Sequence, residues 1–151
     1  KTSVVAGRIE IGGSPAHLNV VESVVVATDG TLYIADAGNS RIQKWSPGDV
    51  VGTTVAGGNG SGDNDNQFNG LTDLFVTEDE TIYVADSANR RVMKWRDGWR
   101  SGIVVAGGHG NGSGLHQFGK PCGITMDSSG ALYIADHDLA RVMKWAAPPQ
   151  A

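Results

Sequence analysis

The strongest constraint on the fold is a thirteen-residue segment that occurs three times. The copies are YIADAGNSRIQKW at 33–45, YVADSANRRVMKW at 83–95 and YIADHDLARVMKW at 133–145, at a constant interval of fifty residues. A repeat of this length without insertions is typical of architectures that place copies of one small structural unit side by side. We therefore interpret the chain as three copies of one unit.

Each copy has the pattern of a β-hairpin. Two short runs rich in β-branched and aromatic residues, with period-two alternation, flank a polar reversal, and this predicts two antiparallel strands. The Asp that ends the first run and the Arg five positions later are expected to pair across the hairpin, as structural rather than catalytic residues. These pairs are Asp36 with Arg41, Asp86 with Arg91, and Asp136 with Arg141.

The rest of each unit supplies two more strands. An apolar run precedes the hairpin at 23–28, 73–78 and 123–127, and a run ending in Val-Ala-Gly follows the first two hairpins. Four short antiparallel strands with one glycine-rich loop per unit predict an all-β propeller with three blades in this chain.

The same residues resemble the NHL-repeat family, whose blades carry a YVAD hairpin followed by an Asn, an Arg and an aromatic residue. The resemblance extends over the whole chain and implies a β-propeller, commonly one of six blades. The third copy departs from the pattern, because Leu139 stands where the other two have Asn39 and Asn89. The repeated tryptophans are expected to pack between blades; they are Trp45, Trp95 and Trp145.

The two ends of the repeat array are complementary. Residues 1–6, KTSVVA, match 51–56 and 101–106 and read as an outer strand without a blade, whereas the blade that ends at Trp145 has no outer strand. We expect one domain over 1–145, with blades at 7–56, 57–106 and 107–145 and a proline-containing tail at 146–151.

Three blades are too few for a closed ring, because propellers close with roughly four to eight. Two chains joined head to tail would give a six-bladed homodimer, in which strand 1–6 of each chain pairs with 141–145 of the other. The alternative is a purely architectural half-propeller that is a fragment of a longer one.

The glycine-rich loops at 57–68 and 107–118 contain the candidate ligand-binding residues. Glycine permits close approach of a partner to the backbone, and the interspersed Asn, Asp, Gln and His side chains offer donors and acceptors. Trp99 lies outside the repeat pattern and is the candidate for an exposed aromatic. The full set is Asn59, Asp63, Asp65, Gln67, Trp99, His109, Asn111, His116 and Gln117.

Metal binding is a weaker interpretation of these loops. Asp63 and Asp65 offer the hard oxygen ligands that Ca²⁺ prefers, but their spacing is not that of an EF-hand loop and no Glu closes it. We prefer a solvated polar loop and expect no cofactor, with calcium as the alternative.

Composition narrows the class of partner. The net charge of −4 lacks the basic excess of a phosphate-backbone binder, which makes a nucleic-acid partner unlikely on electrostatic grounds. No apolar run is long enough to span a membrane. The sequence leaves the compartment undetermined, with secretion preferred.

The favoured function is therefore a non-catalytic propeller that binds a ligand, either a glycan as a lectin does or a protein. The alternative that the resemblance implies is a metal-dependent lyase or lactonase-like enzyme. It would use polar groups where the inner strands begin, at Glu22 and Ser23, Thr72 and Asp73, and Cys122 and Gly123.

Overall fold

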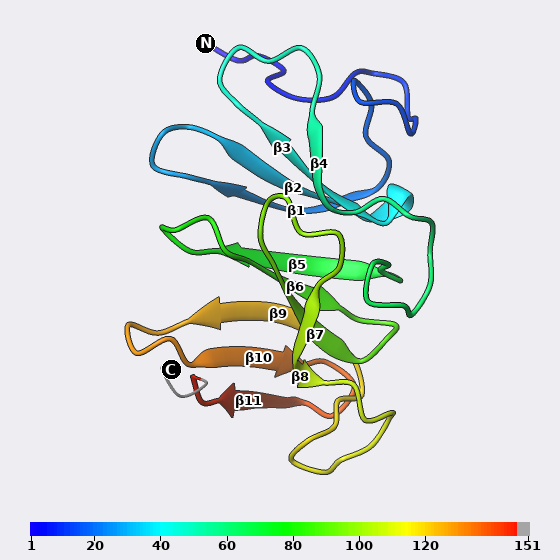
Figure 1. Cartoon of the computed structure of the whole chain (residues 1–151), viewed down its shortest axis with the longest axis vertical. Helices are drawn as coiled ribbons and strands as arrows, with labels where there is room; N and C mark the ends of the chain where they lie inside the picture. The colour runs from blue at the N-terminus through cyan, green and yellow to red at the C-terminus, as the bar shows by residue number, and fades with distance from the viewer. Residues whose placement is uncertain (148–151) are drawn as a thin grey trace.

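Three antiparallel β-sheets follow one another along the long axis of the computed structural model, which describes residues 1–147 (Figure 1). The first sheet contains β1 (Val21–Val26), β2 (Leu32–Asp36), β3 (Arg41–Trp45) and β4 (Thr53–Gly57), with a short 3₁₀ helix η1 (Ala37–Asn39) between β2 and β3. The second contains β5 (Leu71–Val76), β6 (Ile82–Asp86), β7 (Arg91–Trp95) and β8 (Ile103–Gly107). The third contains β9 (Pro121–Met126), β10 (Leu132–Asp136) and β11 (Arg141–Trp145).

Neighbours in each sheet are neighbours in sequence, as in a propeller blade. The predicted all-β blade architecture is confirmed. Among the described residues, however, the third sheet has three strands and the other two have four. We refer to the sheets in chain order as blades 1, 2 and 3.

The inner strand of each blade begins two residues earlier than the sequence indicated, for example at Val21 in β1. Val21 pairs with Asp36 and Ser23 pairs with Ala35, so Glu22 is the extra residue of a β-bulge. The bulge interrupts the period-two pattern on which the prediction depended. The same shift recurs at the start of β5 and β9.

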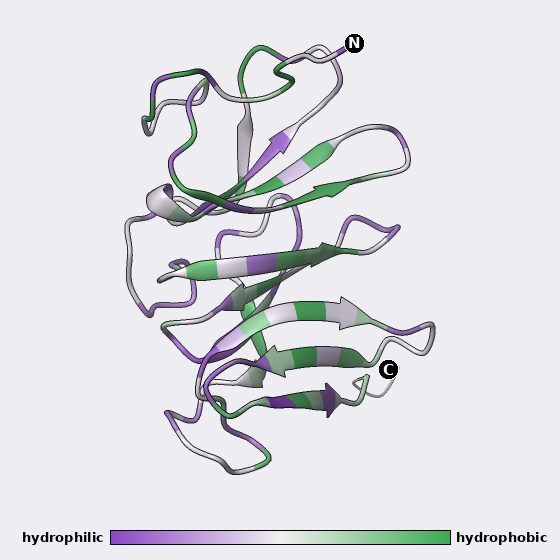
Figure 2. Cartoon of the chain, turned by 180° about the vertical axis from the view of Figure 1, so that it is seen from behind, coloured by the Kyte–Doolittle hydropathy of each residue, from purple (hydrophilic) through white to green (hydrophobic). Residues whose placement is uncertain are grey.

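Two apolar cores lie between the blades. In the first, Tyr33 and Ile42 of blade 1 meet Leu74, Ile82 and Trp95 of blade 2. The second core joins blade 2 to blade 3, and several of its residues lie fifty positions after residues of the first core. Its buried members are Ala85, Val92, Ala106, Phe118, Ile124, Leu132 and Ile134. Figure 2 shows these apolar segments along the strands, with most polar residues in the loops. Blade 2 therefore uses one face against blade 1 and the other against blade 3.

One carboxylate links the inner strands of all three blades. Asp73 on β5 accepts a hydrogen bond from Ser23 Oγ at 2.7 Å and another from the backbone N–H of Ile124 at 2.9 Å. The inner strands are thus held side by side, as they are around the axis of a propeller.

Residues 1–20 form an irregular segment over the end of blade 1 that is uppermost in Figure 1. Residues 1–6, expected to be an outer strand for a neighbouring blade, form no strand in the single chain. Part of the predicted tail, 148–151, lies outside the described residues. Within 1–147, no helix has the length and apolar character needed to cross a bilayer.

Candidate ligand-binding site

The Asp and Arg of each hairpin form an ion pair that also clamps the preceding glycine-rich loop. In blade 2, Arg91 Nε donates to Asp86 Oδ2 at 2.8 Å. The other guanidinium nitrogens donate to the carbonyl oxygens of Asp63, Asn64 and Gln67 at 2.9–3.0 Å. Asp86 and Arg91 are both buried. Beyond the bond between them, Arg91 holds three loop carbonyls and Asp86 Oδ1 accepts from the backbone N–H of Asn69, as expected of structural residues.

The clamp recurs in the other blades with small differences. Arg41 binds Asp36 at 2.7 Å and three loop carbonyls of blade 1. Arg141 binds Asp136 at a longer 3.3 Å, together with the carbonyls of Ser113, Gly114 and Gln117. The sequence predicted the Asp–Arg pairs but not the loop contacts, because these depend on where a segment about 27 residues away comes to lie.

Asparagine reinforces the clamp in two blades. Asn89 Nδ2 donates to Asp86 Oδ2 and to the carbonyl of Gly62, both at 2.8 Å, and Asn39 repeats this in blade 1. In blade 3 Leu139 has no such donor. Burial by itself would raise the pKa of Asp136, but hydrogen bonds from the backbone N–H groups of Lys120 and Gly119, with help from Arg141, outweigh it and leave the pKa lowered.

The clamped loops place several of the candidate binding residues in internal contacts. Asn59 Nδ2 donates to the carbonyl of Asn66, and Gln67 Nε2 donates to the carbonyl of Asn59. In the next loop, Gln117 Nε2 makes the equivalent bond to the carbonyl of His109. These amides, which the sequence predicts as ligand contacts, therefore hold the shape of their own loops.

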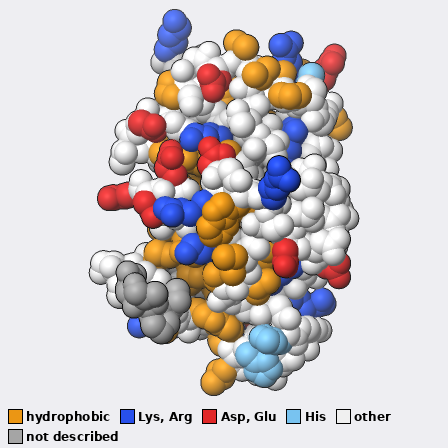
Figure 3. All heavy atoms as spheres, in the orientation of Figure 1, with side chains coloured by type: hydrophobic (Ala, Val, Ile, Leu, Met, Phe, Trp, Pro, Cys, Tyr) orange, Lys and Arg blue, Asp and Glu red, His pale blue; other side chains and the backbone are white. Residues whose placement is uncertain are grey.

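The remaining loop candidates are exposed but do not converge into a metal site. His109 and His116 stack edge to face with ring centroids 5.2 Å apart, and Figure 3 shows pale blue histidine side chains near the lower edge of the molecule. Asp63 is exposed, and Asp65 reaches only the edge of Arg91, at 3.8 Å. Asn111 is exposed and forms a β-bridge with Phe118. Within residues 1–147 no three His, Cys, Asp or Glu side chains come together as metal ligands do.

A hollow of 410 Å³ brings one of the candidate loops beside Trp99. It is lined by Asn59 and Asn66 of that loop and by Asp97, Trp99 and Arg100 of the β7–β8 turn. Residues of β4 and Trp95 complete the lining. The Trp99 side of this hollow is accessible, with 37% of the residue exposed.

The backbone around Trp99 is fixed even though its side chain is free. The Trp95 indole N–H donates to the carbonyl of Trp99 at 3.0 Å, and Trp45 makes the same bond to Asp49 in blade 1. Position 99 is therefore part of the repeat after all, and only the side chain is new. The side chains of Asn66, Asp97 and Arg100 make no hydrogen bond or ion pair with the rest of residues 1–147. The hollow thus offers an aromatic face and three uncommitted polar groups.

A second hollow, of 520 Å³, lies where the inner strands of the three blades begin. Of the inner-strand groups considered for an enzyme, Glu22 and Thr72 line it, whereas Asp73 is held between Ser23 and Ile124. The sequence analysis missed its other polar residues, which are Ser87, Arg90, Lys120 and Asp138. The other copies of the repeat have different residue types at these four positions, so the fifty-residue period did not mark them.

The sequence of blade 1 decides the type of repeat. The family model for the NHL repeat matches residues 18–45, which contain β1, β2 and β3. Residues 18–45 match an NHL repeat. Blades 2 and 3 repeat the pattern of the matched segment at an interval of fifty residues, with the same strand pairings.

Solved structures share the fold of these blades. The chain is similar to a structural-genomics protein of unknown function from Bacteroides thetaiotaomicron, with 21% identity, a TM-score of 0.67, and coverage of 82% of this chain and 34% of the other. It is also similar to an auxiliary nutrient binding protein from the same organism, with 18% identity, a TM-score of 0.64, and coverage of 80% and 36%.

A third structure, virginiamycin B lyase from Staphylococcus aureus, has 12% identity and a TM-score of 0.50, with coverage of 86% of this chain and 42% of the other. The chain therefore spans less than half the length of each of these structures, and at such identities the likeness shows the fold alone. A search of curated protein sequences finds no match.

Proposed function

We propose that this NHL chain is a non-catalytic binding module whose ligand is a carbohydrate held in the hollow beside Trp99. The observation that carries the proposal is the placement of an accessible indole next to three polar side chains without partners in the described chain. An apolar ring face with a few convergent polar groups is what a sugar ring requires, since it has apolar C–H faces and a rim of hydroxyls.

The hollow also has the size and location of a ligand site. Its 410 Å³ falls within the roughly 300–1,000 Å³ of small-molecule pockets. It is built within one chain, from a clamped loop and a hydrogen-bonded turn. The ligand would therefore meet a largely preformed surface, which limits the entropy lost on binding.

The equivalent place in blade 1 lacks this chemistry. Positions 97, 99 and 100 correspond to Pro47, Asp49 and Val50, and positions 59 and 66 to Ile9 and Ala16. The aromatic face and the amides are thus specific to blade 2 and are not a by-product of the repeat. The likeness in fold to a protein described as nutrient-binding is consistent with a binding role.

The test begins with a printed array of neutral and acidic oligosaccharides, followed by calorimetry with the strongest binder. Trp99→Ala is expected to weaken binding roughly tenfold or more, because stacking on an aromatic ring contributes about 1–3 kcal/mol. Trp99→Phe retains a ring face and should stay within a few-fold of the unchanged chain. The fold is expected to survive, because Trp95 bonds to the backbone of residue 99.

Two results would overturn the assignment. One is an array on which no oligosaccharide binds. The other is binding that Trp99→Ala leaves unchanged and Arg90→Ala abolishes, which would place the ligand in the hollow at the inner-strand starts.

A further inference from the structure

We infer that the open edge of blade 3 accepts residues 3–7 of a second copy of this chain, so that two copies close one ring of six blades. This inference is independent of the proposed ligand. It arises from a missing element: within residues 1–147, β11 has β10 on one side and no strand on the other. The equivalent strands β3 and β7 each have an outer partner, β4 and β8.

The chain itself contains a third copy of the outer-strand sequence, besides those in β4 and β8. Residues 3–7, SVVAG, correspond to TTVAG in β4 and to IVVAG in β8. The terminal glycine also has the same left-handed backbone in each copy, with φ of +76° at Gly7, +68° at Gly57 and +71° at Gly107. This conformation is readily available only to glycine, so Gly7 already ends the segment as Gly57 and Gly107 end their strands.

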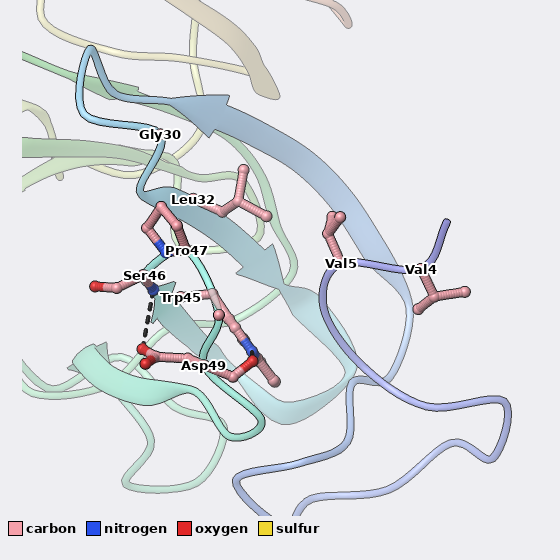
Figure 4. Close-up of a pocket in the computed structure, with 9 residues that line it drawn as sticks. Val4, Val5, Gly30, Leu32, Trp45, Ser46, Pro47 and Asp49 are labelled. Atoms are coloured by element: carbon pink, nitrogen blue, oxygen red, sulfur yellow. Dashed lines mark hydrogen bonds between the residues drawn. The ribbon is translucent and has the colours of Figure 1, made fainter. Parts of the chain in front are cut away.

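The segment lies beside blade 1 in the way that β8, the outer strand of blade 2, lies beside blade 3. Figure 4 shows the chain at Val4 and Val5 passing beside the part of blade 1 that carries Leu32 and Trp45. A hollow of 440 Å³ separates them. The equivalent hollow beside blade 3 has 450 Å³ and is lined by the residues one hundred positions later, Val104, Val105, Leu132 and Trp145. Val104 and Val105 belong to β8, which is paired with β7. Residues 3–7 have no such partner strand within residues 1–147.

Apolar side chains on both β11 and residues 3–7 are exposed to solvent in the single chain. Val142 on β11 is 68% exposed, whereas its equivalent Val92 is fully buried. Val4 and Val5 are 80% and 67% exposed, although Val55, the equivalent of Val5, is only 4% exposed. An unpaired strand edge flanked by exposed valines is a surface that associates.

The open blade faces match in the same way. Val92 lies in one buried cluster with Ile124 and Ile134 of the following blade. The repeat makes Val142 the equivalent of Val92, and makes Val24 and Ile34 the equivalents of the two isoleucines. Val24 is exposed and Ile34 is already buried in the single chain; both belong to blade 1, and blade 2 lies between it and blade 3 (Figure 1). Within residues 1–147 these faces belong to different ends of the row of three blades, and two chains arranged head to tail would form the contact twice.

The register of the new pair follows from the existing ones. β3 pairs with β4, and β7 with β8, through the same positions and the same bulge. Transferred to β11, the pattern places Arg141 opposite Gly7, Val142 opposite Ala6, Met143 opposite Val4, and Lys144 opposite Ser3. Cα atoms opposite each other in antiparallel strands are about 4.5–5.5 Å apart, close enough for a disulfide.

The experiment combines mass and cross-linking. Light scattering after size exclusion should give twice the chain mass of 15.8 kDa. In a Cys122→Ser background, the double variant Val4→Cys with Met143→Cys should oxidise to a covalent dimer on a non-reducing gel. The matched control is Val4→Cys with Met93→Cys, since Met93 has the same place in blade 2 but already pairs with Val104, and it should stay monomeric on the gel.

A third variant separates assembly from folding. Val142→Asp changes a residue that is exposed in the single chain, so circular dichroism should remain that of a β-protein while the mass falls to that of one chain. A monomeric mass for the unchanged chain would overturn the inference. Equal cross-linking of the Met143 and Met93 pairs would overturn the proposed register.

Discussion

Blades 2 and 3 contain the same pentapeptide, RVMKW, at 91–95 and at 141–145, in strands with the same partner in register. In blade 2, Val92, Met93 and Trp95 are buried. In blade 3, Val142 is exposed and Trp145 is half-buried. The same five residues in equivalent hairpins therefore differ in burial because β7 has an outer neighbouring strand and a following blade and β11, within residues 1–147, has neither. A propeller blade is stabilised as much by its neighbours as by its own sequence, as expected for repeat proteins.

The largest difference between the two blades is expected from a charge in the shared strand. Val92→Asp places an unpaired carboxylate in the core between blades 2 and 3 and should lower the free energy of unfolding by about 3 kcal/mol or more. Val142→Asp, at a site exposed in the single chain, should change it by about 0.5 kcal/mol or less once the chain is monomeric. Urea denaturation of both variants at low protein concentration measures the contrast. Equal losses would show that β11 is as enclosed as β7 within one chain.

A smaller contrast is expected from the clamps. Arg91→Ala leaves the buried Asp86 without its ion pair, which should destabilise the protein by about 3–5 kcal/mol. Arg141→Ala removes a longer contact, at 3.3 Å, from a more accessible pair, and a loss of about 1–2 kcal/mol is expected. Thermal unfolding followed by circular dichroism would rank the two. A greater loss in blade 3 would contradict the view that enclosure sets the strength of the clamp.

The smallest expected effect would make blade 3 more like blade 2. Leu139→Asn supplies the amide that Asn89 uses to bind Asp86 and the carbonyl of Gly62. It should stabilise the chain by about 1 kcal/mol, the net contribution of a typical hydrogen bond. The reciprocal Asn89→Leu should destabilise it by about 1–3 kcal/mol, because two acceptors lose their donor. If Leu139→Asn has no effect on the unfolding midpoint, Asp136 is already satisfied by the backbone N–H groups of Gly119 and Lys120.

Sequence reasoning succeeded for features that repeat and failed for features that do not. The hairpins, the Asp–Arg pairs and the packing role of the tryptophans recur every fifty residues, so the period marked them. Of the polar residues that line the hollow at the inner-strand starts, Glu22 and Thr72 were predicted, whereas Arg90, Lys120 and Asp138 were not, because they have no equivalents of the same type. Asn59, Gln67 and Gln117 are predicted ligand contacts, and the structure adds that they bond to their own loops, since a side chain next to glycine finds backbone acceptors close by. Ligand contact by these residues stays a prediction.

The sequence by itself determined the unit of this protein: a hairpin of two alternating runs, its turn, and the number of copies. Period-two alternation and turn chemistry act between near neighbours in the chain, so they can be read without coordinates. Only the tertiary structure decided which polar groups remain uncommitted, such as those around Trp99, and which apolar residues remain exposed, such as Val142. Burial and pairing depend on segments distant in sequence, and for β11 no such segment is in place among the described residues.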